Sequence, residues 1–354
     1  MVHPLLVPLL GLAFRSLEPL GHRPKIRLRQ PFRPPVAARL ATMLRQGQHD
    51  TLRFTLSRLQ GDSQRSSIEA MLEALDEAER CDQWMERLWQ WYRQNREFHA
   101  MTVLIYGLVK YAWMKRSSDA AGAVGEKQAQ AFREALEEAE RLLDKVLATH
   151  PENVDLLCVR LVTGRGLGLE LAQQWSRFRA LIGVDPGHYR GHLAMLESLK
   201  AQWGGSDEAM FKFARARAGQ VPDGHPVKAL IVHAHFEMRN QRHWSGDATV
   251  DDYFRQPEVA DEVEEAWAKS IASPQFRDES RRDELSNLFA AALYLAGRHD
   301  SARLALAMMD GHCLPMPWRT MGGNIKEKGN PGWVVERVSA ELLRADVAAE
   351  LPRR

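Results

Sequence analysis

Four histidines stand close together in the stretch "HPVKALIVHAHFEMRNQRHW", with two carboxylates nearby. They are His225, His233, His235 and His243, and the carboxylates are Glu237 and Asp247. Imidazoles beside carboxylates are ligands for zinc or iron. On a helix, however, His233 and His235 lie about 200° apart, whereas the metalloprotease arrangement needs two histidines four positions apart. The spacing instead puts His235, Arg239 and His243 on one face, which we interpret as a polar stripe that contacts a partner. A metal bound by His233, His235 and His243 is the alternative.

A second candidate for chemistry is the stretch "QWGGSDEAM". The backbone N–H groups of Gly204, Gly205 and Ser206 could hold an anion at the start of a helix. The structural interpretation is that a glycine in the left-handed conformation ends one helix and Ser206 caps the next. Acidic residues follow at once, and they already complement the helix dipole and would repel a phosphate. We therefore predict a helix stop and a cap, with Trp203 as the packing anchor.

Nucleophile motifs are absent from the sequence, which has no G-x-S-x-G, no Walker loop and no dinucleotide-binding glycine fingerprint. The three cysteines, Cys81, Cys158 and Cys313, form no C-x-x-C pair. His312 precedes Cys313, but no third group that would orient the histidine is apparent. We expect no enzyme activity and no cofactor.

The elements that would position these residues are helices. Apolar residues recur at helical spacing, as in "AFREALEEAERLLDKVL", where one face carries Phe132, Leu136, Ala139, Leu143, Val146 and Leu147. Pro186 follows Pro151 by 35 positions and Pro222 follows Pro186 by 36, close to the period of about 34 residues of a tetratricopeptide array. The sequence predicts an all-α fold, an α-α superhelix of degenerate tetratricopeptide-like helical hairpins.

Three regions follow from this pattern. Residues 1–35 are Pro-rich and basic, and prolines at 24, 31, 34 and 35 favour an extended arm. Residues 36–310 form the helical repeat domain. Residues 311–354 hold a long loop and a C-terminal capping helix.

The segment from about Gly47 to His235 resembles a family of uncharacterised bacterial proteins with an all-helical, tetratricopeptide-like domain. The pattern W-G-G-S-x-E-x-M-x-x-F-A-R carries the resemblance, and it is matched by Trp203, Gly204, Gly205, Ser206, Glu208, Met210, Phe213, Ala214 and Arg215. Family members show Ala-Arg-Gly after the tryptophan of an earlier helix, where this sequence has Met114-Lys115-Arg116-Ser117 after Trp113. The resemblance implies an α-α superhelix and supplies no catalytic residues.

Aromatic residues indicate where a partner would bind. The run "LWQWY" cannot bury all its rings on one helical face, so we expect Trp89 or Trp91 at a groove or interface. The segment from Gly311 to Trp333 mixes aromatic anchors with donors and suits partner capture; the alternative is a loop that caps the end of the array. Its candidate residues are Trp318, Arg319, Lys326 and Trp333.

The charge balance, 48 Lys and Arg against 46 Asp and Glu, points to no nucleic-acid partner. The apolar run from Leu5 to Phe14 is too short to cross a bilayer, and the cysteine usage fits a cytoplasmic protein. Because repeat arrays present extended binding surfaces, we expect a non-catalytic protein that binds another protein. The role we favour is a bacterial immunity protein that binds and neutralises a toxic effector. A scaffold or regulator of a bacterial protein assembly and a His-dependent metalloenzyme are the alternatives.

Overall fold

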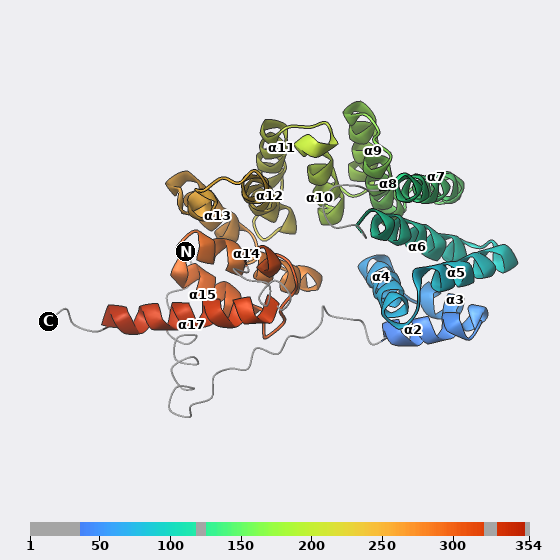
Figure 1. Ribbon diagram of the computed structural model, residues 1–354, viewed down its shortest axis with the longest axis horizontal. Helices are drawn as coiled ribbons and strands as arrows, with labels where there is room; N and C mark the ends of the chain where they lie inside the picture. Colours follow the sequence, from blue (N-terminus) through green and yellow to red (C-terminus); the bar gives the residue numbers. More distant parts are fainter. Residues whose placement is uncertain (1–35, 118–124, 322–330, 351–354) are drawn as a thin grey trace, which may run out of the picture. The chain divides into compact units, whose positions relative to one another are not determined.

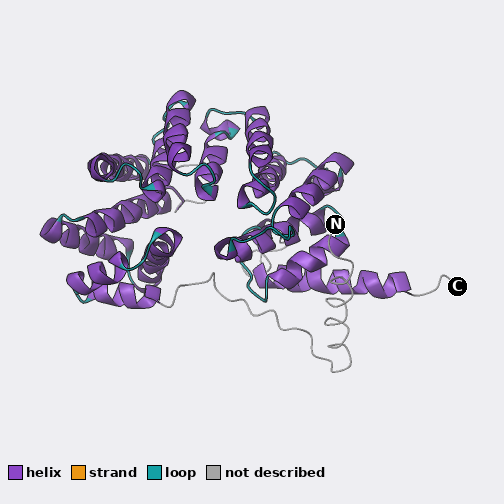
Figure 2. Cartoon of the chain, turned by 180° about the vertical axis from the view of Figure 1, so that it is seen from behind, coloured by secondary structure: helices purple, strands orange, loops and turns teal. Residues whose placement is uncertain are grey.

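The computed structural model describes residues 36–117, 125–321 and 331–350, and these residues form helices joined by loops, with no strand among them (Figure 2). The all-α prediction is therefore confirmed. The basic arm of residues 1–35 lies outside the described residues. The chain divides into two compact units, Arg33–Met210 and Phe211–Arg354, where the sequence predicted one repeat domain over residues 36–310. We call them the N-terminal unit and the C-terminal unit.

The N-terminal unit is a stack of helices in which each helix from α4 to α10 packs on the next, while α3 packs on α2 and α6. Its elements are α2 (Val36–Arg45), α3 (His49–Ser57), α4 (Gly61–Ala78), α5 (Cys81–Asn95), α6 (Phe98–Ser117), α7 (Glu126–Thr149), α8 (Val154–Gly166), α9 (Leu171–Val184), α10 (Tyr189–Ser198) and the short 3-10 helix η2 (Ala201–Trp203). Contacts also run from α4 to α6, from α6 to α8 and from α8 to α10. These four helices form one layer, which we call the inner layer, and α5, α7 and α9 form the other (Figure 1).

The predicted hairpins owe their turns to particular residues. Gly47 has a left-handed φ of 66° between α2 and α3. Asn153, two residues after Pro151, caps α8, and its side chain accepts a hydrogen bond from the N–H of Leu156 at 3.0 Å. The face predicted for α7 is buried along its whole length. The core of this unit is thus made of one apolar face from each helix.

The C-terminal unit continues with hairpins of the same kind, and η segments are 3-10 turns between them. Its elements are α11 (Asp207–Gln220, beginning just before the boundary), η3 (Pro226–Ala229), α12 (Leu230–Trp244), η4 (Val250–Arg255), α13 (Pro257–Lys269), η5 (Glu279–Arg281), α14 (Arg282–Leu295), α15 (His299–Met308), η6 (Trp318–Met321) and α17 (Pro331–Glu350). Helix α14 packs against α15, where Ala290 and Ala302 are fully buried and Gly297 makes the turn with φ 71°. Small residues there let the helices approach.

Candidate functional site

The turn at residues 203–206 is a helix stop and a cap. Gly204 is left-handed with φ 86° and ends η2. The hydroxyl oxygen of Ser206 accepts a hydrogen bond from the N–H of Ala209 at 3.1 Å, so it caps α11. Gly205 lies so close to Leu199 that a Cβ atom built on it would be 1.9 Å from the Leu199 carbonyl oxygen. The prediction of a structural role for Gly204, Gly205 and Ser206 is confirmed.

The predicted histidine stripe points inward. His235 is 2% exposed, with its Nδ1 2.8 Å from the hydroxyl of Tyr253 and its Nε2 3.0 Å from a carboxylate oxygen of Glu262. Arg239 is 6% exposed and donates to the carbonyl oxygen of Thr320 at 3.1 Å and to Asp251 at 3.3 Å. A partner-binding role for His235 and Arg239 was wrong, because α13, η4 and η6 cover that face of α12. Only His243, at the end of α12, is exposed.

Glu262 is held as a carboxylate by its neighbours. Arg215 donates two hydrogen bonds to it, at 2.7 and 2.9 Å. This pairing, with a further contribution from His235, lowers the pKa of Glu262 from 4.5 to about 2, against the effect of burial. The Arg215–Glu262–His235 network therefore ties α11 and α12 to α13.

The depressed pKa of Glu262 predicts acid sensitivity. Its stabilising effect is fully present above pH 4.5, the unfolded value, and is lost as the pH falls towards 2. Because Glu262 keeps part of its surface in water, we expect the effect to be only about 1–2 kcal/mol. Urea denaturation at pH values between 2 and 7 measures it. In Glu262→Gln the drop in stability over this window should be smaller than in the parent chain; an equal drop would contradict the assignment.

A metal site at the histidines has no support in the geometry. His225 caps η3 by accepting from the N–H of Val227 at 3.2 Å, while His235 is engaged with Tyr253 and Glu262. Over the described ranges, no three His, Cys, Asp or Glu side chains come together as ligands for a metal ion. His233 and His243 therefore do not join His235 in a ligand set.

The segment after α15 is packed where it was expected to be a structureless loop. From Gly311 to Met321 it lies on α14, held by the side chain of Asn287, which is 0% exposed. The Asn287 amide nitrogen donates to the carbonyl oxygen of His312 at 2.8 Å, and its oxygen accepts from the Trp318 indole at 2.8 Å and from the N–H of Leu314 at 3.0 Å. Sequence reasoning missed Asn287, since an asparagine inside an apolar helix gives no signal of its distant partners.

The candidate residues of this segment separate accordingly. Trp318 is fully buried, so its expected role as a surface anchor was wrong. Arg319 and Trp333 are exposed, Trp333 by 46%. Lys326 lies outside the described residues. Residues Gly311–Met321 thus fit the alternative interpretation, in which the segment caps the end of the array.

His312 and Cys313 do not form a nucleophilic pair. Asp283 orients His312, since its carboxylate oxygen is 2.8 Å from His312 Nδ1. The sequence did not reveal this partner. Cys313, however, is 2% exposed and its thiol contacts the carbonyl oxygen of Leu314. Burial raises the pKa of Cys313 to about 12, and burial likewise raises that of Cys158 to about 12. Both thiols are protonated at neutral pH and are poor nucleophiles.

The tryptophans of α5 divide between core and edge. Trp91 is 0% exposed and stacks on the ring of His49, with the ring centroids 5.8 Å apart, so its placement at an interface was wrong. Trp89 is half-buried and packs edge-on against Tyr92, and the guanidinium of Arg93 lies over its ring. Of the pair, Trp89 is the one that reaches the surface.

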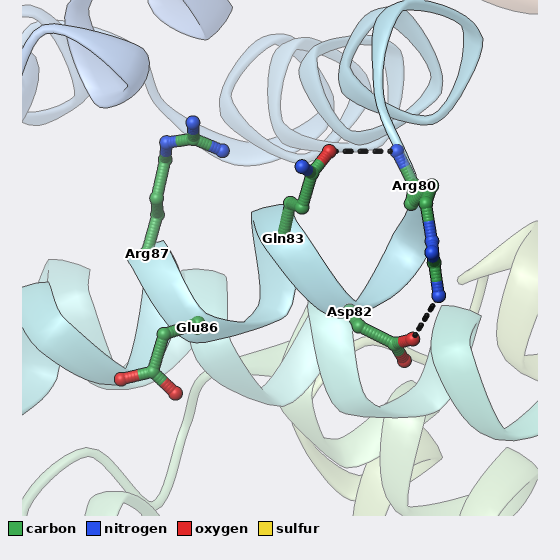
Figure 3. A pocket seen from close by; sticks show the side chains of 5 residues that line it. All are labelled: Arg80, Asp82, Gln83, Glu86 and Arg87. Atoms are coloured by element: carbon green, nitrogen blue, oxygen red, sulfur yellow. Dashed lines mark hydrogen bonds and ion pairs between the residues drawn. The ribbon is translucent and has the colours of Figure 1, made fainter.

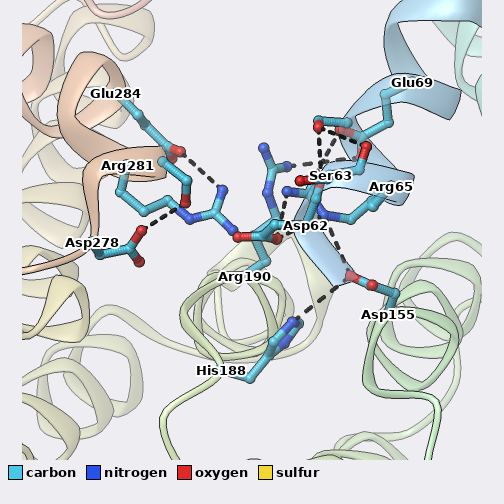
Figure 4. Close-up of polar contacts among 12 residues, drawn as sticks. Asp62, Ser63, Arg65, Glu69, Asp155, His188, Arg190, Asp278, Arg281 and Glu284 are labelled. Carbon is cyan, nitrogen blue, oxygen red and sulfur yellow. Dashed lines mark hydrogen bonds and ion pairs between the residues drawn. The ribbon is translucent and has the colours of Figure 1, made fainter. Parts of the chain in front are cut away.

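A charge network in the inner layer of the N-terminal unit is the strongest candidate site (Figure 4). Arg65 on α4 is 6% exposed and has its guanidinium 2.8 Å from Asp62, 2.7 Å from Glu69 and 3.4 Å from Asp155 on α8. His188, the cap of α10, has its Nε2 4.0 Å from Asp155. We call Asp62, Arg65, Glu69, Asp155, His188 and Arg190 the inner charge network.

The network extends from the interior to the surface. The side chains of Asp62, Glu69 and Arg190 keep 40%, 38% and 38% of their surface exposed. Arg190 Nη1 is 4.0 Å from Glu69. Arg190 Nε is buried and has no hydrogen-bond partner among the described residues, whereas the buried Asp155 Oδ1 has its ion pairs with Arg65 and His188. Asp62, Glu69 and Arg190 are therefore the members whose exposed surface a partner can contact.

Burial and like charges act on the groups of the network. Burial raises the pKa of Asp155, and the Arg65 guanidinium opposes this rise. For Arg65, burial lowers the pKa, but Glu69 and Asp62 outweigh burial and raise it above its usual value. Arg65 stays charged and is held at the centre of three carboxylates. Sequence reasoning missed this network because its members come from three helices and form no local motif.

A shallow pocket of about 540 Å³ lies on α5 (Figure 3). It is lined by Arg80, Asp82, Gln83, Glu86 and Arg87. Asp82 is 3.5 Å from the Arg80 guanidinium and 3.8 Å from Lys115 Nζ, and Arg87 pairs with Glu79. The half-buried Cys81, between Arg80 and Asp82, has its sulfur 3.8 Å from Lys115 Nζ. Mixed charges that already pair with one another leave this surface without a preference for one ligand charge.

No family model, no curated protein and no solved structure matches the sequence. Within the described part of the chain, none of the helices combines the length and the apolar character that crossing a bilayer requires.

Proposed function

We propose that the protein is a non-catalytic binding protein that recognises another protein through the inner layer of its N-terminal unit. The inner charge network is the observation that carries this proposal. Stacked helical hairpins present side chains of successive inner helices on one surface, and such surfaces bind extended stretches of a partner. A network with both signs of charge and with exposed members suits a partner with complementary charges.

The exposed members of the network supply specificity. Arg190 on α10 and Glu69 on α4 carry opposite charges 4.0 Å apart, so a partner must place both signs in register with them. Like charges brought together at an interface are costly and exclude other partners. Arg65 is locked by its three carboxylates and serves to hold the surface residues in place.

The partner we propose is a toxic effector, which makes the protein an immunity protein. Sequestering an effector requires a surface complementary to the effector and requires no catalytic group. The inner charge network can supply such a surface. A scaffold or regulator of a protein assembly would use the same surface, and the identity of the partner separates the two roles.

The test uses Arg190→Glu and a matched control, Arg179→Glu. Arg179 is exposed on α9, in the other layer of the same unit. The product of the neighbouring reading frame is co-purified with each variant and its toxicity is measured in cells that express the variant. Because a reversed charge meets its partner's like charge, we expect Arg190→Glu to weaken binding at least about tenfold and to abolish protection. Arg179→Glu should bind and protect as the parent chain does.

Three outcomes count against parts of the proposal. Equal loss in both variants would show that the inner layer is not the binding surface. Capture of a non-toxic component of an assembly would favour the scaffold role over immunity. Failure of the parent chain to bind or to protect against the neighbouring product would overturn the immunity role.

A further inference from the structure

Two arginines and two tryptophans meet where α6, α8 and η2 end. They are Trp113 and Arg116 on α6, Arg165 on α8 and Trp203 on η2, and we call them the tryptophan–arginine cluster. The Cζ atom of Arg116 is 4.5 Å from the centroid of the Trp203 ring, and that of Arg165 is 5.8 Å from it. The same two atoms are 5.6 and 5.3 Å from the centroid of Trp113. Both guanidinium groups thus pack against the same pair of rings.

Among the described residues, no ion pair balances the positive charge of this cluster. Neither Arg116 nor Arg165 forms an ion pair with any residue that the structure describes, although Glu197 acts on Arg165 from a longer distance. Glu197 itself is 2.8 Å from Lys200 Nζ. Burial, and to a lesser degree the charge of Arg116, lower the pKa of Arg165. The C-terminal ends of α6 and α8 each supply only about half a negative charge. For the part of the chain that the structure describes, a net positive charge therefore remains at the cluster.

Several hydrogen-bond donors in the cluster also lack an acceptor among the described residues. Nε and Nη1 of Arg165 and the indole Nε1 of Trp113 are buried and have no hydrogen-bond acceptor among the described residues. Buried donors without acceptors are rare in proteins, and each costs free energy. Cation–π contacts with the two rings offset part of this cost. An acceptor from outside the chain would satisfy the remainder.

The glycine turn explains how Trp203 comes to complete the cluster. The left-handed Gly204 turns the chain immediately after Trp203, and Gly205 packs against the backbone of Leu199. The Trp203 ring then lies edge-on to Trp113, with the centroids 6.0 Å apart. Ser206 already caps α11, so the charge here comes from the arginines and not from a helix N-terminus.

We propose that the tryptophan–arginine cluster binds an oxyanion of the phosphate class. Arg116, which is exposed, provides the way in from solvent and makes the first contact. Arg165 closes on the oxyanion from between the rings, where its planar group can donate two parallel hydrogen bonds. The aromatic rings keep water from the inner side of the site and so strengthen the attraction.

Inorganic phosphate is the probe that tests this site. Calorimetric titration of the full chain should show saturable binding with a Kd below about 10 mM, since two guanidinium groups contact one anion. Sodium chloride at equal ionic strength should show none. Tryptophan fluorescence should change over the same phosphate concentrations, because Trp113 and Trp203 contact both arginines. Sulfate should compete with phosphate if the oxyanion alone is recognised, and a phosphate monoester that binds more tightly than phosphate would identify the larger ligand.

The variants separate this site from general charge effects. Arg116→Gln, at an exposed position, and Arg165→Gln should each weaken phosphate binding at least about tenfold. Arg179→Gln, the matched control on α9, should bind as the parent chain does. Trp203→Phe should lose part of the fluorescence change while its circular dichroism spectrum stays that of the parent chain. The proposal is overturned if the parent chain shows no saturable binding, or if Arg116→Gln and Arg179→Gln bind phosphate equally well.

Discussion

Asn287→Ala is expected to lower the free energy of unfolding by about 3–5 kcal/mol, because it leaves the buried indole N–H of Trp318 and the N–H of Leu314 without acceptors. It also removes the amide group that donates a hydrogen bond to the carbonyl oxygen of His312. Guanidinium denaturation measures the change. Hydrogen exchange locates it, since the amides of residues 311–321 should lose protection before those of α14.

The control for this prediction is Asn95→Ala, at an exposed position on α5. We expect it to change stability by no more than about 0.5 kcal/mol. If Asn287→Ala also stayed within this range, the packed segment would not depend on Asn287, and its anchor would have to be the buried ring of Trp318 alone.

Gly205→Ala is the second change with a large expected effect. Its Cβ atom would lie 1.9 Å from the Leu199 carbonyl oxygen and 2.4 Å from the Leu199 carbonyl carbon, both of which are backbone atoms. Backbone cannot swing aside as the end of a side chain does, so α10 and the turn must separate. We expect a loss of about 3 kcal/mol or more in thermal or urea denaturation.

Two other glycines, Gly204 and Gly219, provide the comparison for this loss of stability. Gly204→Ala has open space for its Cβ but keeps a left-handed φ of 86°, so we expect a loss of about 1–2 kcal/mol. Gly219→Ala, within α11 and with no atom within 4 Å, should stabilise the protein by up to about 1 kcal/mol. An order other than Gly205, Gly204, Gly219 would show that close packing against Leu199 does not dominate at this turn.

Local sequence determined the helices and their ends. The left-handed glycines at 47, 204 and 297 end helices, and the caps at Asn153 and Ser206 depend on atoms within four residues of the cap. Such interactions can be read from a short window of sequence. The same holds for the buried face of α7, which follows from the spacing of its apolar residues.

The candidate site could not be read in this way. His235 and Arg239 were correctly placed on one helical face, but that face is buried because Tyr253, Glu262 and Asp251, all distant in sequence, provide its polar partners. The inner charge network could not be predicted at all, because Asp62, Arg65 and Asp155 look like ordinary surface charges in the sequence. Only the contact between α4 and α8 shows that Arg65 is buried.

The raised pKa of two thiols has a practical consequence. The half-buried Cys158 and the buried Cys313 are held protonated, and Cys81 is the half-buried first residue of α5. The raised pKa leaves little thiolate on Cys158 and Cys313, so a maleimide reacts slowly with them. We therefore expect a limiting amount of maleimide dye or spin label to react first at Cys81, beside the α5 pocket.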